Sequence, residues 1–429
     1  MTHPREDSTE LAPTPSARQR TREELADYLL DIGATLASYG CPSYRLEDVI
    51  RAIAEAEGYR AEPFALPTGL FLRVTPQVRG EEPVAEVNRM TRLSDWGVDL
   101  GRLTLIDAIF NDVVERRATI EQARTRIRAI VKQPPQWSTS MVWAATTVAA
   151  GAAAVFFRGA LVDVFAASVI GAVIGGSGVL LRNPTHRLLS EFLGGLFAAT
   201  CAWLATQVWP TALPEVIVLA GAISLFPGMT FTTGLAEVAQ KNLVSGGARL
   251  MESAVTLLLI LFGVALVAGF QTITGVPMPH NAAPRVGLGL PFQALALGLS
   301  SLAFAVIFQV PRRYLWAALV SGATGYAVTS LAVRYLPEAP HVAAFCAALA
   351  VCVQSNGLAR ITNRPAQLFQ LPGMILLVPG SFGFVSLGQL LAKKAEAGVQ
   401  EGFTMALVGA ALVIGVLVAN VVMPPRKLL

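Results

Sequence analysis

Ten apolar runs, each long enough to cross a bilayer as a helix, fill the chain from residue 138 onward. A membrane helix needs about 20 mostly apolar residues, because the hydrocarbon core is about 30 Å thick. Prolines and arginines separate the runs, as at Pro311-Arg312-Arg313. The predicted spans are 138–157, 160–181, 188–209, 213–234, 245–270, 288–309, 313–335, 340–358, 367–392 and 403–424.

Residues 21–137 show the mixed pattern of a small water-soluble α+β domain. Residues 62–75 are predicted to form strand with a turn at 67–69, and amphipathic helices are predicted from about 21, 43, 102 and 119. Capping boxes of Thr21 with Glu24 and of Thr119 with Gln122 mark two of these helix starts. Residues 1–20 are rich in Pro, Thr, Ser and Arg and lack an apolar signal-peptide core, so we expect a disordered tail.

One short motif occurs twice inside the apolar runs. GAISLFPG at 221–228 and GMILLVPG at 373–380 share five of eight residues at an offset of 152. A proline inside a helix removes a backbone donor and pushes against the carbonyl four residues earlier. Pro227 and Pro379 should therefore break spans four and nine, leaving the carbonyls of Ile223 and Ile375 without their usual partner. Gly228 and Gly380, which follow these prolines, should then let the backbone change direction.

The positions of the two breaks predict an inverted repeat. They lie five spans apart, and because five is odd the two halves should enter the bilayer in opposite senses. The predicted fold class is mostly α, with ten transmembrane helices as two five-helix inverted repeats and the small cytosolic domain. The halves would cover 138–272 and 288–425, after the domain at 21–137.

Composition and loop charge support a membrane protein with both termini in the cytoplasm. Hydrophobic residues make up 53% of the 429, charged residues only 14%, and the mean hydropathy is +0.54. With the soluble domain inside, the inner loops and C-terminus hold ten Lys and Arg and the outer loops hold five, as the positive-inside rule requires. The net charge of +4 is modest. The sequence has no basic patch with interleaved aromatic residues, which would indicate binding to nucleic acid.

Polar side chains gather near the two breaks and are the candidates for a transport site. Hydroxyls and amides there could hold the ammonium or carboxylate of an amino acid, with freed carbonyls suiting the first and a helix N-terminus the second. The candidate substrate-binding residues are Pro227, Gly228, Thr230, Thr233, Pro379, Gly380, Ser381, Gln354 and Asn356.

Ionisable residues after the first break are the candidates for proton coupling. Acidic groups at membrane depth are costly and usually functional, which favours Glu237 and Glu252 as proton carriers. The alternative places both at the membrane interface, paired with Arg249 or Lys241. Glu237 and Gln389 both lie nine residues after the glycine of their break, so one half carries an acid where the other carries an amide.

Other kinds of chemistry find little support. No nucleotide-binding loop is present, the four histidines are isolated, and no cysteine pair has CxxC spacing, so neither cofactor nor metal is expected. In the cytosolic domain, Tyr44, Arg45 and Glu47 are candidates for a regulatory or substrate-presenting role, with solvated helix faces and structural pairs as the alternative.

Five segments carry a resemblance to a known family. They are GCPSYRLEDVI at 40–50, RMTRLSDWGVDLGRLTLIDAI at 89–109, TIEQARTRIRAIVKQPPQWS at 119–138, LFPGMTFTTGLAEVAQKNLVSGGARLMESA at 225–254 and LVPG at 377–380. With these segments the chain resembles, from about residue 21 to 425, the threonine/serine exporter family of bacterial and fungal membrane proteins. The resemblance implies export of threonine and serine driven by the proton motive force, by a multi-pass protein of the bacterial inner membrane.

Three alternatives stay open at this point. The family includes split members associated with dicarboxylate export, and for a substrate such as succinate Arg249 would matter more than Glu252. A membrane-anchored hydrolase would have its activity in residues 1–137, which offer no obvious nucleophile–base pair and no histidine after His3. A passive channel would ignore a pH gradient. Association with further copies of the chain is also compatible with the sequence.

Overall fold

A computed structural model describes residues 15–77, 86–93, 97–180, 184–276 and 287–425. The chain divides into two compact units. The N-terminal unit contains the described residues up to 93 together with 108–132, and the membrane unit contains 97–107 and the described residues from 133 onward. Each unit is described by itself.

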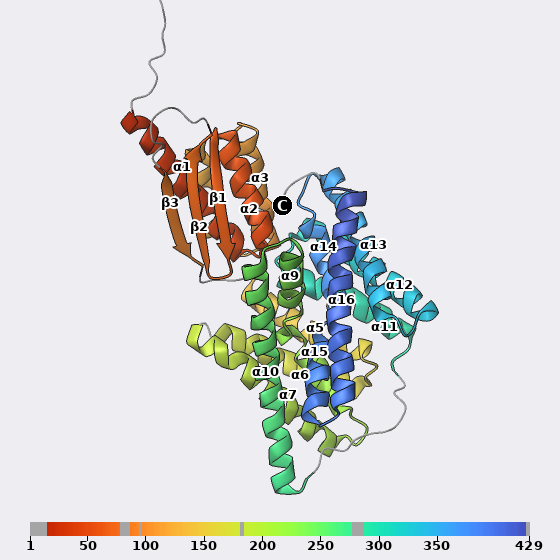
Figure 1. Cartoon of the computed structure of the whole chain (residues 1–429). Coiled ribbons are helices and arrows are strands. Elements are labelled where there is room, and N and C mark those ends of the chain that lie inside the picture. Colours follow the sequence, from red (N-terminus) through yellow and green to blue (C-terminus); the bar gives the residue numbers. More distant parts are fainter. Residues whose placement is uncertain (1–14, 78–85, 94–96, 181–183, 277–286, 426–429) are drawn as a thin grey trace, which may run out of the picture. The chain divides into compact units, whose positions relative to one another are not determined.

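The N-terminal unit is a helix-covered antiparallel sheet of three strands in the order β1-β2-β3. Helices α1 and α2 lie against it (Figure 1). Small and branched side chains of β1 and β2, such as Ala61, Leu70 and Val74, are buried on one face, whereas the alternate positions are exposed. Its elements are α1 (Pro15–Ser38), α2 (Ser43–Ala56), β1 (Tyr59–Leu66), β2 (Gly69–Pro76), β3 (Val87–Arg92), the second part of α3 (Leu100–Val114) and α4 (Ile120–Lys132).

Several predictions for this unit can be compared directly with the structure. The predicted strand segment is an antiparallel hairpin in which Leu66 pairs with Gly69. The predicted capping box at α4 is confirmed, since the Thr119 N–H donates to Gln122 and the Gln122 N–H donates to Thr119, at 3.2 and 3.3 Å. The box at Thr21 is wrong, because α1 begins at Pro15 and Thr21 lies inside it. The helix thus extends into the predicted tail, whose residues 1–14 lie outside the described residues.

The membrane unit is helical (Figure 1). Within the described residues nine helices are long and apolar enough to cross a membrane, or ten if the bent pair around the first proline is one span. The chain is thus a multi-pass membrane protein. The elements are α5 (Thr139–Phe156), α6 (Leu161–Leu180), α7 (Pro184–Val208), α8 (Pro214–Gly221), η1 (Ile223–Leu225), α9 (Gly228–Ala239), α10 (Leu243–Thr274), α11 (Leu290–Ile307), η2 (Arg312–Tyr314), α12 (Leu315–Tyr335), α13 (Pro340–Thr362), α14 (Gln367–Met374), η3 (Ile375–Leu377), α15 (Gly380–Leu391) and α16 (Ala395–Val422).

Corresponding pairs of helices are in contact within each half of this unit. The contacts of α5 with α6, α7 with α10 and α9 with α10 correspond to those of α11 with α12, α13 with α16 and α15 with α16. The tight crossings correspond too. A Cβ on Gly263 of α10 would lie 2.4 Å from the Phe192 carbonyl oxygen, and one on Gly415 of α16 would lie 3.0 Å from that of Phe345. Small residues let helix backbones approach closely in a membrane. Both halves therefore have a glycine at a corresponding close helix crossing.

Candidate functional site

Both predicted breaks occur, and the backbone follows the same route through each. After η1, Phe226 is extended (φ −66°, ψ 126°), Pro227 has φ −80° and ψ 37°, and α9 begins at Gly228. After η3, Val378 is extended (φ −68°, ψ 133°), Pro379 has φ −83° and ψ 28°, and α15 begins at Gly380. The axes of the two helical segments around the first break, before and after Ala222, differ by 47°.

One detail of the predicted break needs correction. The carbonyl of Ile375 does have a partner, because the chain tightens into the 3-10 turn η3 and the Val378 N–H donates to it at 3.4 Å. A 3-10 turn is a common way to satisfy carbonyls at the end of a helix. The bond is long, and a carbonyl oxygen has two lone pairs, so this oxygen can still accept from a ligand.

The two breaks are in contact with each other. A Cβ built on Gly228 would lie 2.2 Å from Val378 Cγ1 and 3.2 Å from the Gly380 nitrogen. The rings of Phe226 and Phe384 pack beside this contact, with centroids 5.2 Å apart. The N-termini of α9 and α15 therefore meet. Helix N-termini carry partial positive charge, so this place favours negative charge.

A cavity of about 380 Å³ adjoins the crossing. Its walls include residues 375–378 of the second break, Ile223 of the first, and four phenylalanines, Phe156, Phe157, Phe304 and Phe382. A volume of this size is in the range of small-molecule sites, which are mostly apolar with a few polar groups.

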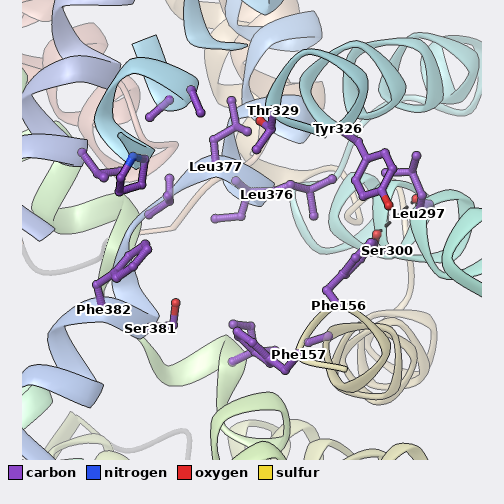
Figure 2. A pocket seen from close by; sticks show the side chains of 18 of the residues that line it. Phe156, Phe157, Leu297, Ser300, Tyr326, Thr329, Leu376, Leu377, Ser381 and Phe382 are labelled. Carbon is purple, nitrogen blue, oxygen red and sulfur yellow. Dashed lines mark hydrogen bonds between the residues drawn. The ribbon is translucent and has the colours of Figure 1, made fainter. Parts of the chain in front are cut away.

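The polar side chains of the cavity are hydroxyls. Ser381, in the first turn of α15, lies across the space from Ser300 and Tyr326 (Figure 2). Ser300 donates to the Leu297 carbonyl at 3.1 Å, and Tyr326 donates to Gln293 Oε1 at 2.9 Å. The Thr329 hydroxyl oxygen is buried and has no partner among the described residues. Apart from the Tyr326 phenol, no described residue lining the cavity has an ionisable side chain.

Comparison with known proteins identifies the family. One sequence model described as a threonine/serine exporter matches residues 27–271, and a second with the same description matches residues 293–422. Together they cover nearly the whole chain. The chain belongs to the threonine/serine exporter family. The first match ends in α10 and the second begins in α11, so the division between the two matches lies between the two halves of the membrane unit.

Several curated relatives of this exporter-family chain are fungal proteins. An uncharacterized protein of Schizosaccharomyces pombe is 23% identical over 403 residues, which are 88% of this chain and 49% of the relative. Pheromone-regulated membrane protein 10 of Yarrowia lipolytica is 22% identical, over 86% of this chain and 30% of its own length, and that of Saccharomyces cerevisiae is 21% identical, over 85% and 47%. The chain thus spans half or less of these relatives. No solved structure matches.

The structure brings only some of the predicted substrate residues of this family member to the cavity. Ser381 lines it, and the two Pro-Gly pairs form the crossing beside it. Thr230 and Thr233 are half-buried on α9 and are not among the lining residues. Gln354 accepts a hydrogen bond from Thr324 at 2.5 Å, which ties α13 to α12.

Asn356 forms hydrogen bonds to the end of α16 and is not among the residues that line the cavity. It donates to Asn420 Oδ1 at 3.0 Å and to the Met423 carbonyl at 2.8 Å. Conversely, sequence reasoning missed Ser300, Tyr326 and Thr329. A single hydroxyl in an apolar helix gives no signal of its own, since it usually bonds a carbonyl of its own helix.

Two of the charged candidates form a buried cluster, which matches the paired alternative in part. Glu237 is completely buried, and its Oε2 accepts from Ser245 at 2.7 Å and from Arg249 Nε at 3.1 Å. Only 9% of Arg249 is exposed, so this ion pair is shielded from water. Glu252, by contrast, is exposed on the surface of α10. Of the two predicted proton carriers, only Glu237 is enclosed by protein.

Of the three candidates in the N-terminal unit, Glu47 joins two of its elements. Arg45 and Glu47 are each only 8% exposed, and Tyr44 is half-buried. Glu47 accepts from the Ala65 backbone N–H at 3.0 Å and from Arg51 at 2.8 Å, which joins α2 to β1. Within the described residues no group of His, Cys, Asp and Glu could hold a metal ion.

Proposed function

We propose that this family member is a secondary exporter of threonine and serine, working by proton antiport in a cell membrane with both termini in the cytoplasm. The observation that carries the proposal is the cavity at the crossing, whose polar side chains are hydroxyls and whose described lining residues carry no formal charge. Such a site suits a small ligand that has no net charge yet needs several hydrogen bonds.

The absence of charged side chains among the described lining residues argues against the dicarboxylate alternative. Burying an ionised carboxylate without a counter-charge costs far more than burying a hydrogen-bonded neutral group. A dicarboxylate would bring two such charges, and Arg249, the candidate partner for such a substrate, does not line the cavity and is already bonded to Glu237. A zwitterionic amino acid brings its own compensating charges.

Each end of the zwitterion has a suitable partner at the second break. The carboxylate would accept from the Ser381 hydroxyl at the positive N-terminal end of α15. The ammonium would donate to the Ile375 carbonyl oxygen, whose present bond from Val378 is long. The Thr329 hydroxyl has no partner among the described residues, so its oxygen can accept a hydrogen bond from the side-chain hydroxyl that threonine and serine share.

Glu237 is the proposed proton carrier. Protonation of this carboxylate would remove the negative charge that the Arg249 guanidinium and the Ser245 hydroxyl compensate in this buried site. The ion pair would then weaken, and α9 and α10, which it links, could move apart at the first break. The opposite insertion of the two halves, predicted from the odd number of spans, supplies the alternating access that such antiport needs.

Counterflow in proteoliposomes tests the substrate. We expect labelled threonine to enter liposomes loaded with threonine or serine, and to be displaced by serine but not by succinate. Ser381→Ala should raise the KM for threonine at least about tenfold, because a buried hydrogen bond to a charged group contributes about 1.5–3 kcal/mol. Ser177→Ala on α6 is the matched control, since that hydroxyl bonds its own helix at Ile174. Displacement by succinate alone would favour dicarboxylate export instead.

A pH gradient tests the coupling separately. Glu237→Gln keeps hydrogen-bond acceptors for Arg249 and Ser245 but cannot titrate, so threonine counterflow should persist while acceleration by a pH gradient disappears. Glu252→Gln is the matched control, and we expect it to retain that acceleration because Glu252 is exposed. If Glu237→Gln responds to the gradient as the wild type does, Glu237 is not the carrier, and the substrate proposal stands on its own result.

A further inference from the structure

A second pocket, of about 310 Å³, lies within the membrane unit and shares no lining residue with the cavity described above. We call it the basic pocket. Three chain segments form it: the start of α3, the residues that lead into α5, and the residues that lead into α12. Its charged and amide lining residues are Asp99, Arg102, Gln133, Gln136, Arg312 and Arg313.

The pocket is built on a well-bonded frame. The Leu100 N–H, in the first turn of α3, donates to the Phe308 carbonyl at 3.0 Å. The Trp137 backbone N–H donates to Gln309 Oε1 and its indole N–H donates to the Val310 carbonyl, both at 2.8 Å. These bonds hold all three segments together, so the pocket is largely preformed and a ligand would lose little free energy in ordering it.

The side chains give the pocket a net positive charge. Three guanidinium groups face one carboxylate, and Arg102 already engages Asp99 (Nε to Oδ2, 3.6 Å) and donates to the Gln133 carbonyl. Arg312 stacks over the Trp137 ring at 5.0 Å, and Arg313 stacks over the Tyr314 ring at 4.8 Å. Both of these arginines are exposed, and neither forms an ion pair or side-chain hydrogen bond with a described residue. Their donors point to an anion from outside the chain.

The place of the pocket along the chain identifies the kind of anion. Trp137 comes two residues before α5, and Arg313 comes two residues before α12, and both helices are candidate membrane spans. Tryptophan and arginine at span ends are typical of the membrane–water interface, where lipid headgroups lie. Guanidinium groups bind phosphate through paired hydrogen bonds. We propose that the basic pocket binds the phosphate of an anionic phospholipid headgroup.

Lipid binding to the full-length protein tests this proposal. The probe is phosphatidylglycerol, added to protein in neutral detergent and compared with phosphatidylcholine, with binding followed by native mass spectrometry and by thermal unfolding. We expect phosphatidylglycerol to bind and stabilise the wild type, and the Arg312→Gln/Arg313→Gln variant to bind it at least about tenfold more weakly. Arg334→Gln is the matched control, because Arg334 is an exposed arginine in the last turn of the same helix α12. It should behave as the wild type does.

A third variant guards against a merely misfolded double variant. Asp99→Asn removes the carboxylate of the pocket while keeping an oxygen that can accept the Arg102 N–H (2.8 Å in the wild type). It should bind phosphatidylglycerol more tightly than the wild type. Equal phosphatidylglycerol binding by all four proteins would overturn the proposal. So would equal stabilisation by inorganic phosphate, which would make the ligand a free anion.

Discussion

Replacing Gly228 by alanine tests the contact between the two breaks. The added Cβ would lie 2.2 Å from Val378 Cγ1 and 3.3 Å from the Gly380 Cα. Val378 Cγ1 must retreat by at least 1.2 Å to reach an ordinary contact of 3.4 Å. Val378 also lines the cavity of about 380 Å³ beside the two breaks, so this retreat would change the shape of the proposed site.

The cost can be estimated from the packing. Forcing extra volume into a well-packed interior costs about 1–3 kcal/mol. Alanine gains little helix propensity in return, because Gly228 is the first residue of α9 and not an interior one. A loss of 1 kcal/mol lowers the melting temperature of a domain of about 150–250 residues by about 2–4 °C. We therefore expect Gly228→Ala to melt several degrees below the wild type and to slow threonine counterflow.

A double-mutant cycle isolates the contact. Val378→Ala removes the Cγ1 atom that the new methyl would meet, so Gly228→Ala/Val378→Ala should be more stable than the sum of the single changes predicts, by about 1–2 kcal/mol. Gly388→Ala on α15 is the control, since its Cβ would enter open space. It should be neutral or stabilising, because alanine favours helix over glycine.

Two results would refute the reasoning. If Gly228→Ala melts with the wild type and transports normally, the breaks are not packed against each other as described. If the two substitutions simply add in the cycle, the methyl at position 228 does not meet Val378. A loss in Gly388→Ala as large as that in Gly228→Ala would show that any added methyl on these helices is harmful, and the crossing would have no special role.

Three further changes have clear expected outcomes in thermal unfolding. Gly246→Ala should destabilise by about 1–3 kcal/mol, because its Cβ would lie 2.6 Å from the Gly234 carbonyl oxygen, whereas the neighbouring Gly247→Ala enters open space and should not. Tyr28→Phe should leave the melting temperature unchanged or raise it, since the buried Tyr28 hydroxyl has no partner among the described residues. Burial raises the pKa of Asp99, so the folded protein holds that proton more tightly and gains stability as pH falls through the raised pKa; Asp99→Asn should abolish this gain.

Local signals in the sequence predicted the elements well where they act alone. The proline breaks, the hairpin and the capping box of Thr119 and Gln122 each depend on a few adjacent residues, and the structure contains all three. Strand β3 was missed because its sequence VNRMTR mixes charged and apolar residues without a clear period. It is specified by pairing with β2, with Leu72 opposite Arg89, which is a tertiary contact.

The candidate site shows the same limit more sharply. The breaks could be found because proline acts on its own backbone and because the motif occurs twice. The hydroxyls that line the cavity could not, because Ser300, Tyr326 and Thr329 come from two helices and only the packing of these helices brings them near Ser381. Likewise, spacing alone left Glu237 and Glu252 equivalent, and burial distinguishes them.

The backbone arrangement of the first half of the membrane unit recurs in the second half, but the polar and charged residues do not. The left-handed residue after α9 is Lys241 and the one after α15 is Lys393, 152 positions later, so the backbone repeats even there. At the same offset, however, Glu237 becomes Gln389 and Arg249 becomes Glu401, so the ion pair belongs to the first half only. The cavity hydroxyls all belong to the second half. The two halves thus share a backbone arrangement but carry different polar groups. In the proposed antiport the proton would bind in the first half and the substrate in the second, and the two halves are in contact where Gly228 meets Gly380.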